Sequence, residues 1–233
     1  MSQLRNFLWT HRGVFLPRGV TKETLDVLPG FQIRDDDVVV ASYPKTGIYR
    51  TCFSSAVPSL LSSQQVKVLV PMRNPKDTAV SMFHFSKKLM PMMGGNADDL
   101  RWEDFVQGFS AGIVPYGDFC DHVSGWWQMR DDPHFLFLKY EDMKKDLLSA
   151  VKTIVTFLEV DLDESTVKEI AEASTFNNMK PVLDNAAAAE SRHIARKGIA
   201  GDWKNTFSAE ESEAFDTWCE KKLGGTGLTF DFE

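Results

Sequence analysis

Short apolar runs alternate along this chain with longer segments in which apolar residues recur at helical spacing. Three runs have the composition of buried strands of a parallel sheet: Val38–Ser42, Val66–Pro71 and Phe135–Leu138. Helices are predicted over Thr78–Lys88, Trp102–Ala111, Tyr116–Met129, Asp142–Leu158, Glu164–Ala173 and Ala209–Lys222, the last with Ser208 as its N-cap. Strands separated by helices pair in parallel. The pattern therefore predicts an α/β fold, with a central parallel sheet flanked by helices in a single domain over residues 1–233.

The composition is that of an ordinary globular protein. The chain has 233 residues, 43% hydrophobic and 25% charged, which is enough for one substantial core. No apolar run approaches the roughly 18 residues of a membrane span, and Met1–Arg12 lacks the apolar centre of a signal peptide. The cysteines, Cys52, Cys120 and Cys219, lack metal-ligand spacing, so we expect a cytoplasmic protein without a metal. A net charge of −7 argues against nucleic-acid binding, so any anionic ligand needs a local basic pocket.

The first predicted strand leads into a loop with the residues that phosphate binding requires. Its sequence is Tyr43-Pro44-Lys45-Thr46-Gly47. A Lys-Thr-Gly turn at a strand end can direct backbone N–H groups, a hydroxyl and an ammonium at one point. The order differs from the Walker pattern, which ends in Gly-Lys-[Ser/Thr]. Taken alone, a Pro-Lys-Thr-Gly loop is more often a plain turn than a phosphate site.

The other two predicted strands also end in candidate ligand-binding residues. Arg73 follows the second strand, where a guanidinium can grip a phosphate, and Ser81 lies about one turn inside the next helix. Asp77 is placed to act as its N-cap or first-turn acid. Tyr140 follows the third strand, where its ring can lie beside a base. The alternatives are a surface Arg–Asp pair and a core tyrosine.

A further basic cluster lies near the end of the chain. Arg196 and Lys197 precede Gly198, which permits close backbone approach, so the three form a compact anion site or, alternatively, a solvated basic loop. Several separate basic or hydroxyl clusters indicate a ligand with more than one phosphate.

In this order the blocks resemble the cytosolic sulfotransferases. Tyr43–Arg50 is similar to the family's Tyr-Pro-Lys-Ser-Gly-Thr-Thr-Trp loop, and Arg73–Ser81 contains its Arg-Asn-Pro-Lys-Asp…Ser block. Tyr140–Met143 and the Arg-Lys-Gly-x-x-Gly-Asp-Trp-Lys segment, Arg196–Lys204, are present in full. The resemblance implies a single α/β domain with a P-loop-like phosphosulfate-binding loop. It also implies 3′-phosphoadenosine 5′-phosphosulfate as the co-substrate.

The resemblance also implies roles for individual residues. Lys45, which would stabilise the bridging oxygen as the sulfuryl group leaves, and Ser81 would be the catalytic residues. The implied nucleotide-binding residues are Lys45, Thr46, Gly47, Ile48, Tyr49, Arg50, Arg73, Ser81, Tyr140, Ser174, Thr175, Phe176, Asn177, Asn178, Met179, Arg196, Lys197 and Gly198. The loop would cradle the 5′-phosphosulfate, the basic clusters the 3′-phosphate, and Tyr140 with residues 174–179 the adenosine.

The chain departs from the family between Lys45 and Arg73, where it is much shorter. The absent portion would carry acceptor-binding residues and the histidine that serves as the family's general base. Ala56 falls at the position of that histidine, and no other histidine is an obvious substitute. The composition of Thr51–Gln65 predicts a short helix or none.

Two classes of function therefore remain open. One is a sulfotransferase acting on a hydroxyl or amine of a small acceptor of the phenol, alcohol, steroid or amine class. The other is a catalytically impaired protein that binds 3′-phosphoadenosine nucleotides; a kinase-like activity is disfavoured. Lys204, Ser208, Ala209 and Glu213 keep only the ends of the family's dimer segment, so we expect a weak homodimer or a monomer without membrane or nucleic-acid partners.

Overall fold

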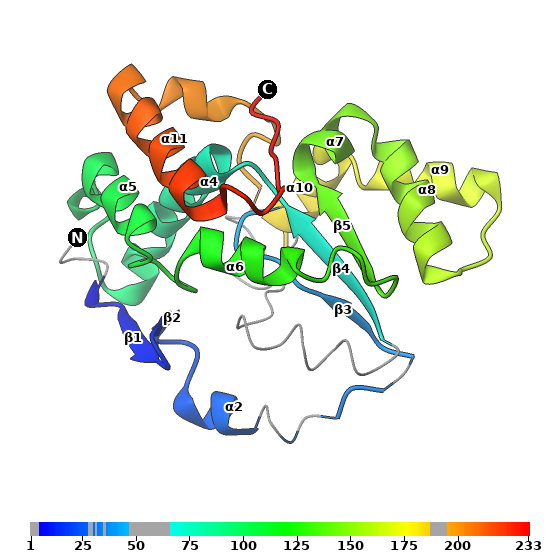
Figure 1. Ribbon diagram of the computed structural model, residues 1–233, viewed down its shortest axis with the longest axis horizontal. Coiled ribbons are helices and arrows are strands. Elements are labelled where there is room, and N and C mark those ends of the chain that lie inside the picture. Colours follow the sequence, from blue (N-terminus) through cyan, green and yellow to red (C-terminus); the bar gives the residue numbers. More distant parts are fainter. Residues whose placement is uncertain (1–4, 28–29, 31, 35, 47–65, 187–194) are drawn as a thin grey trace.

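The computed structural model describes residues 5–27, 30, 32–34, 36–46, 66–186 and 195–233 and contains a central parallel sheet (Figure 1). Its strands are β3 (Val38–Val40), β4 (Lys67–Met72) and β5 (Phe135–Lys139), in the order β3-β4-β5. Val39 pairs with Val68, and Val70 with Phe137. The α/β fold and its three predicted strands are confirmed. Because the strands are parallel, their carboxyl ends, where Tyr43, Arg73 and Tyr140 follow, meet at one edge.

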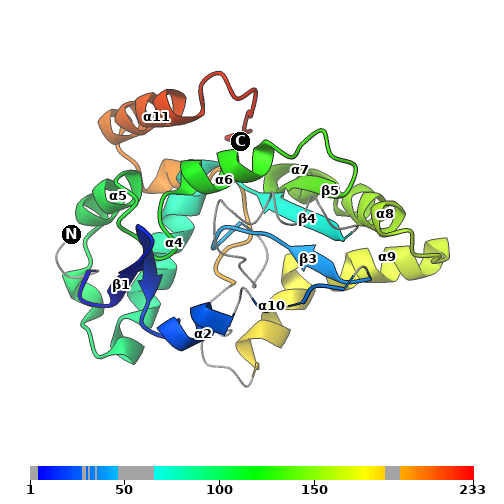
Figure 2. The ribbon, with the colours of Figure 1, turned by 60° about the horizontal axis from the view of Figure 1, so that its bottom comes forward.

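The helices flank this sheet. Their bounds are α2 (Lys22–Val27), α4 (Pro75–Leu89), α5 (Trp102–Ser110), α6 (Phe119–Trp127), α7 (Tyr140–Lys145), α8 (Leu147–Leu158), α9 (Glu164–Ala173), α10 (Phe176–Asp184) and α11 (Ala209–Leu223). Short 3₁₀ turns are η2 (Pro91–Met93), η3 (Ala97–Asp99) and η5 (Asp202–Asn205). The predicted start of α11 is confirmed, because Ser208 and Glu211 form a reciprocal capping box. Figure 2 shows α8 and α9 lying together beyond β5.

Two predicted helices were too long. The helix expected over Tyr116–Met129 begins at Phe119, because Tyr116 and Gly117 have left-handed φ angles of 73° and 77°. The helix expected over Asp142–Leu158 is divided into α7 and α8 at Asp146. The Asp146 backbone is extended, and its carboxylate accepts a hydrogen bond from the Ser149 N–H, which caps α8.

Several elements were not predicted from the sequence. An antiparallel hairpin, β1 (Leu8–His11) and β2 (Val14–Pro17), precedes the sheet. The short helix α2 and the helix α10 were also missed. α10 is polar and contains Pro181, which breaks the expected helical pattern. The polar composition and the internal proline both weaken the apolar periodicity from which a helix is predicted.

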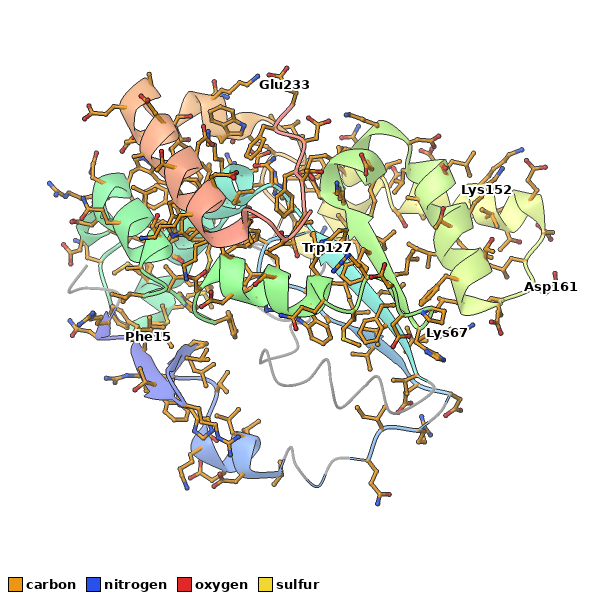
Figure 3. The ribbon with its side chains drawn as sticks, viewed as in Figure 1. Phe15, Lys67, Trp127, Lys152, Asp161 and Glu233 are labelled. Carbon is orange, nitrogen blue, oxygen red and sulfur yellow. The ribbon has the colours of Figure 1, made fainter. Side chains whose placement is uncertain are left out.

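The main core lies between the sheet and helices α4, α5, α6 and α11. Tyr43 is fully buried in it, and its hydroxyl donates a hydrogen bond of 2.7 Å to the Gly117 carbonyl. α6 packs against β5 through Trp127, whose ring centroid lies 5.1 Å from that of Phe137 (Figure 3). Tyr43 therefore anchors the loop after β3 to the start of α6.

Two further findings concern the part of the chain that the structure describes. None of the helices combines the length and apolarity that crossing a bilayer requires. No group of three or more His, Cys, Asp or Glu side chains in these ranges is placed to hold a metal ion.

Candidate functional site

The loop after β3 forms a tight turn that presents Lys45 to α4. The Ala41 N–H donates to the Leu69 carbonyl at 2.8 Å, which extends the pairing beyond β3. The Thr46 hydroxyl donates to the Tyr43 carbonyl at 2.8 Å and so helps to close the turn. Lys45 has a left-handed φ of 75°, and its Nζ lies 4.7 Å from the centroid of the Phe85 ring. The predicted loop lysine is thus held by an unusual backbone conformation.

Lys45 lies among other positive charges. Burial and the charges of three neighbouring cations lower the pKa of its ammonium to about 7. These cations are Arg73, Lys88 and Arg196. They come from the end of β4, the exposed side of α4 and the segment before η5. A partly buried ammonium surrounded by like charges is unfavourable, and an anion bound between them would reverse the effect.

Arg73 connects three parts of the site. Its guanidinium is almost fully buried and donates to the Ile199 carbonyl at 2.9 Å, with a longer contact of 3.5 Å to the Lys45 carbonyl. It also stacks over Tyr140, 4.2 Å from the ring centroid. The Nε atom is buried and has no hydrogen-bond partner in the part of the chain that the structure describes. One donor of this buried cation is therefore left unsatisfied by the residues that the structure describes.

The second basic cluster is ordered by Asp202. Arg196 and Lys197 both pair with its carboxylate, Lys197 at 2.6 Å. Burial opposes ionisation of Asp202, but hydrogen bonds from these two cations and from Asn205 lower its pKa to about 2. Arg196 Nε is also buried without a partner among the described residues. The cluster is therefore an organised ion-pair network rather than a solvated loop.

Gly198 brings this cluster into contact with α10. Its φ is 67°, and a Cβ atom there would lie only 2.1 Å from Cδ2 of Phe176. Only glycine combines this backbone conformation with so close an approach to a ring. Two predicted nucleotide-binding positions, Gly198 and Phe176, are therefore packed together.

The remaining predicted site residues lie on α4, at α9 and α10, or outside the described residues. Ser81 is buried in the second turn of α4. Ser174 ends α9, Thr175 precedes α10, and Asn177, Asn178 and Met179 are exposed on α10. The Asn178 amide is already bonded to Glu172. Gly47, Ile48, Tyr49, Arg50, Ala56 and the segment Thr51–Gln65 lie outside the described residues.

Sequence reasoning missed two residues beside Lys45. Phe85 contacts its ammonium, and Lys88 contributes to lowering its pKa. Both could have been found from helical spacing, because Phe85 and Lys88 lie four and seven residues after Ser81 and share its face of α4.

A buried histidine lies near the same loop. The His122 ring is 5.4 Å from the Tyr43 ring, and burial lowers its pKa to about 4. Its Nε2 has no partner within the described ranges. His122 therefore remains neutral at physiological pH.

Comparisons with known proteins agree on one class. A family model described as the sulfotransferase domain matches residues 48–227. The amine sulfotransferase of rabbit is 31% identical over an alignment of 290 residues, covering 99% of this chain and 95% of the rabbit protein. Sulfotransferase 1A1 of dog is 36% identical over 75% of this chain, which spans 60% of the dog protein's length. The crystal structure of mouse sulfotransferase SULT7A1 complexed with PAP has a TM-score of 0.83 and 28% identity, covering 94% of both chains.

These matches define the family of the protein as well as its fold. The chain belongs to the sulfotransferase family. Because the rabbit alignment is longer than the 233 residues of this chain, the rabbit protein contains residues that have no counterpart here.

Proposed function

We propose that this protein binds 3′-phosphoadenosine 5′-phosphosulfate and transfers its sulfuryl group to a hydroxyl or amine of a small acceptor. The observation that carries the proposal is the convergence of Arg73, Lys88 and Arg196 on Lys45, whose pKa is lowered to about 7 by burial and by these cations. Such a site gains free energy when a polyanion binds. The mouse relative, whose structure is complexed with PAP, supports the same class of nucleotide.

The predicted residues divide between the two anionic ends of this nucleotide. Lys45 and Thr46 would hold the 5′-phosphosulfate, together with Gly47, Ile48, Tyr49 and Arg50 of the same loop. Arg73, Ser81, Arg196, Lys197 and Gly198 would hold the 3′-phosphate. Tyr140 and residues 174–179 would surround the adenosine, with the Tyr140 ring against Arg73 and the Phe176 ring against Gly198.

Transfer requires the acceptor's oxygen or nitrogen to attack sulfur while the bond from sulfur to the bridging phosphate oxygen breaks. The electron pair of that bond stays on the phosphate oxygen, where charge develops. A protonated Lys45 would stabilise this charge, and Ser81 would keep the nucleotide in place. The acceptor's proton must pass to a base, and because the resemblance puts Ala56 at the position of the family's histidine, water would have to accept that proton.

A second candidate function is nucleotide binding with impaired transfer or none. The alanine at the expected base position and the residues of the rabbit relative that have no counterpart here favour it. Its cation sites would be unchanged, so nucleotide binding alone does not separate the two functions.

We also propose a cytoplasmic protein without a metal that acts on a small acceptor of the phenol, alcohol, steroid or amine class, and that is a weak homodimer or a monomer. The rabbit relative's name supports the amine class. Two residues of the short dimer segment already have partners within the chain: Lys204 pairs with Glu233 at 2.5 Å, and Ser208 caps α11. These intramolecular bonds reduce what the segment offers to a second copy.

Two measurements test the proposed function. First, 3′-phosphoadenosine 5′-phosphate should raise the melting temperature through mass action, and Arg196→Ala should weaken its binding by about 1–3 kcal/mol. Lys168→Ala is the matched control, because the Lys168 side chain is exposed on α9, and this variant should bind the nucleotide normally. Second, radiolabelled donor with a panel of phenols, alcohols and amines separates transfer from binding alone. No thermal shift at millimolar nucleotide would refute both functions.

A further inference from the structure

The carboxylate of Asp77 lies between the two basic clusters and contacts the backbone of one of them. It is 1% exposed and lies in the first turn of α4. Its Oδ2 accepts a hydrogen bond from the Gly201 N–H at 2.7 Å, and its Oδ1 accepts one from the Trp203 N–H at 2.9 Å. Residues 201 and 203 are more than 120 positions away in the sequence. Asp77 therefore does more than supply an acid to the first turn of its own helix, whose N-cap is Asn74.

These two bonds are made by the residues immediately before and after Asp202. Asp77 holds the peptide N–H groups on either side of that residue, and Asp202 in turn orients Arg196 and Lys197 through its own carboxylate. Gly201 has a left-handed φ of 79°, so the backbone turns sharply at the first bond. The position of both cations thus depends on a carboxylate that touches neither of them.

On its other side, Asp77 is joined to Arg73 and to the end of β5. Its Oδ2 lies 3.6 Å from an Arg73 Nη and accepts a bond from the Asn74 amide at 3.0 Å. The Asn74 amide and backbone N–H both donate to Glu141 Oε1, at 3.0 and 2.9 Å. Glu141 is fully buried and directly follows Tyr140. One buried polar network therefore connects the ends of β4 and β5 with the 196–203 segment.

We propose that Asp77 is a positioning residue for nucleotide binding, which holds the 196–203 segment so that Arg196 and Arg73 reach the same ligand. The inference rests on the proposed function. A carboxylate suits this task because it accepts bonds from two backbone N–H groups and also balances the Arg73 charge. An amide in its place would direct its NH₂ group at one of those N–H groups.

The test is a double-mutant cycle in affinity for 3′-phosphoadenosine 5′-phosphate, measured by calorimetry well below the melting temperature of each variant. Asp77→Asn should weaken binding about 10- to 100-fold, the scale of lost charge-assisted bonds. In an Arg196→Ala background the same substitution should weaken binding by a factor at least about 3-fold smaller than in the wild-type protein, because the part of its effect that runs through Arg196 has been removed. Fully additive losses, or normal affinity of Asp77→Asn, would overturn the proposal.

Asp118→Asn is the matched control. Asp118 also accepts bonds from two backbone N–H groups, those of Cys120 and Asp121, and pairs with Lys222. Asp118→Asn should lower the melting temperature, as Asp77→Asn does, but its nucleotide affinity should stay within about 2-fold of that of the wild-type protein. This difference separates a positioning role from a loss of stability alone. If Asp77→Asn does not fold, Asp77→Glu, which keeps the charge and displaces the carboxylate, takes its place in the cycle. Wild-type protein that fails to bind the nucleotide would refute the proposed function, and this inference with it.

Discussion

The environments of Lys45 and Lys76 differ completely, although both side chains are largely withdrawn from solvent. Lys76 Nζ donates to Ser212 Oγ and to Asp216, both at 2.7 Å, and lies 4.3 Å from the centroid of the Trp203 ring. The charges that lower the pKa of Lys45 are all positive. Lys76 joins α4 to α11, whereas Lys45 lies where several cations converge.

The difference shows how a structural lysine can be distinguished from a ligand-binding one. A buried charge that serves stability is accompanied by its counter-charge within the chain, because an uncompensated charge is costly. At Lys45 the neighbouring charges that shift the pKa are positive, so that a bound anion would be attracted there. The proposed roles follow from this contrast, and the next three predictions test it, from the largest effect to the smallest.

Lys45→Met should have the largest effect. Donor-dependent sulfuryl transfer should fall by at least about 100-fold, because the charge that develops on the bridging oxygen loses its stabilising cation. The melting temperature should stay the same or rise, since one of several mutually repelling charges is removed. Transfer rates and thermal melts measure the two effects, and 3′-phosphoadenosine 5′-phosphate affinity replaces the rate if turnover is absent. A destabilised variant with normal affinity would contradict the contrast.

Lys76→Met should show the opposite pattern. The side chain keeps its packing against Trp203 but loses its bonds to Ser212 and Asp216. The free energy of unfolding should fall by about 1–2 kcal/mol, at the low end for charged bonds because Asp216 is half exposed. Urea titration measures this loss, and affinity for 3′-phosphoadenosine 5′-phosphate should stay within about 2-fold. A loss of affinity as large as that of Lys45→Met would mean that Lys76 also serves the ligand.

The smallest expected effect is the uptake of a proton when the nucleotide binds. The Lys45 side chain has a pKa of about 7 in the free protein, so it is mostly a neutral amine at pH 8. A bound anion would raise that pKa. Binding of 3′-phosphoadenosine 5′-phosphate at pH 8 should therefore take up close to one proton, and affinity should fall as pH rises above about 7. Calorimetry in two buffers of different ionisation enthalpy measures the uptake. Lys45→Met should take up none, and equal uptake by both proteins would assign the proton elsewhere.

The same lowered pKa has a consequence for stability without ligand. The unfolded chain keeps the Lys45 proton up to about its ordinary pKa of 10.5, whereas the folded chain releases it near 7. Because the unfolded state binds more protons between these values, the contribution of this group to stability increases with pH across that window.

Much of the fold could be predicted from the sequence because its signals are local. The apolar runs predicted β3, β4 and β5, and periodicity predicted α9 over Glu164–Ala173 with the bounds that the structure has. Errors arose where a single residue's backbone conformation decided the outcome. Tyr116 and Asp146 each end a pattern that periodicity alone would continue. The polar helix α10 has too few apolar positions to be recognised.

The candidate site was only partly predictable. Lys45, Arg73 and Arg196 were each indicated by the residues around them, but as separate clusters, and their convergence is a result of the structure. Lys88 and Phe85 were missed, because their importance comes from contact with Lys45 rather than from any local pattern. The bonds of Asp77 to residues 201 and 203 were equally invisible.

The sequence by itself determined the α/β class, the parallel sheet and the residues present at its carboxyl edge, because strand patterns and turn chemistry act over a few neighbouring positions. Only the tertiary structure decided that Lys76 pairs with Asp216. It also decided which cations surround Lys45, namely Arg73, Lys88 and Arg196. Charge interactions and the cost of burial depend on distance and solvent exposure, and the linear order of residues specifies neither.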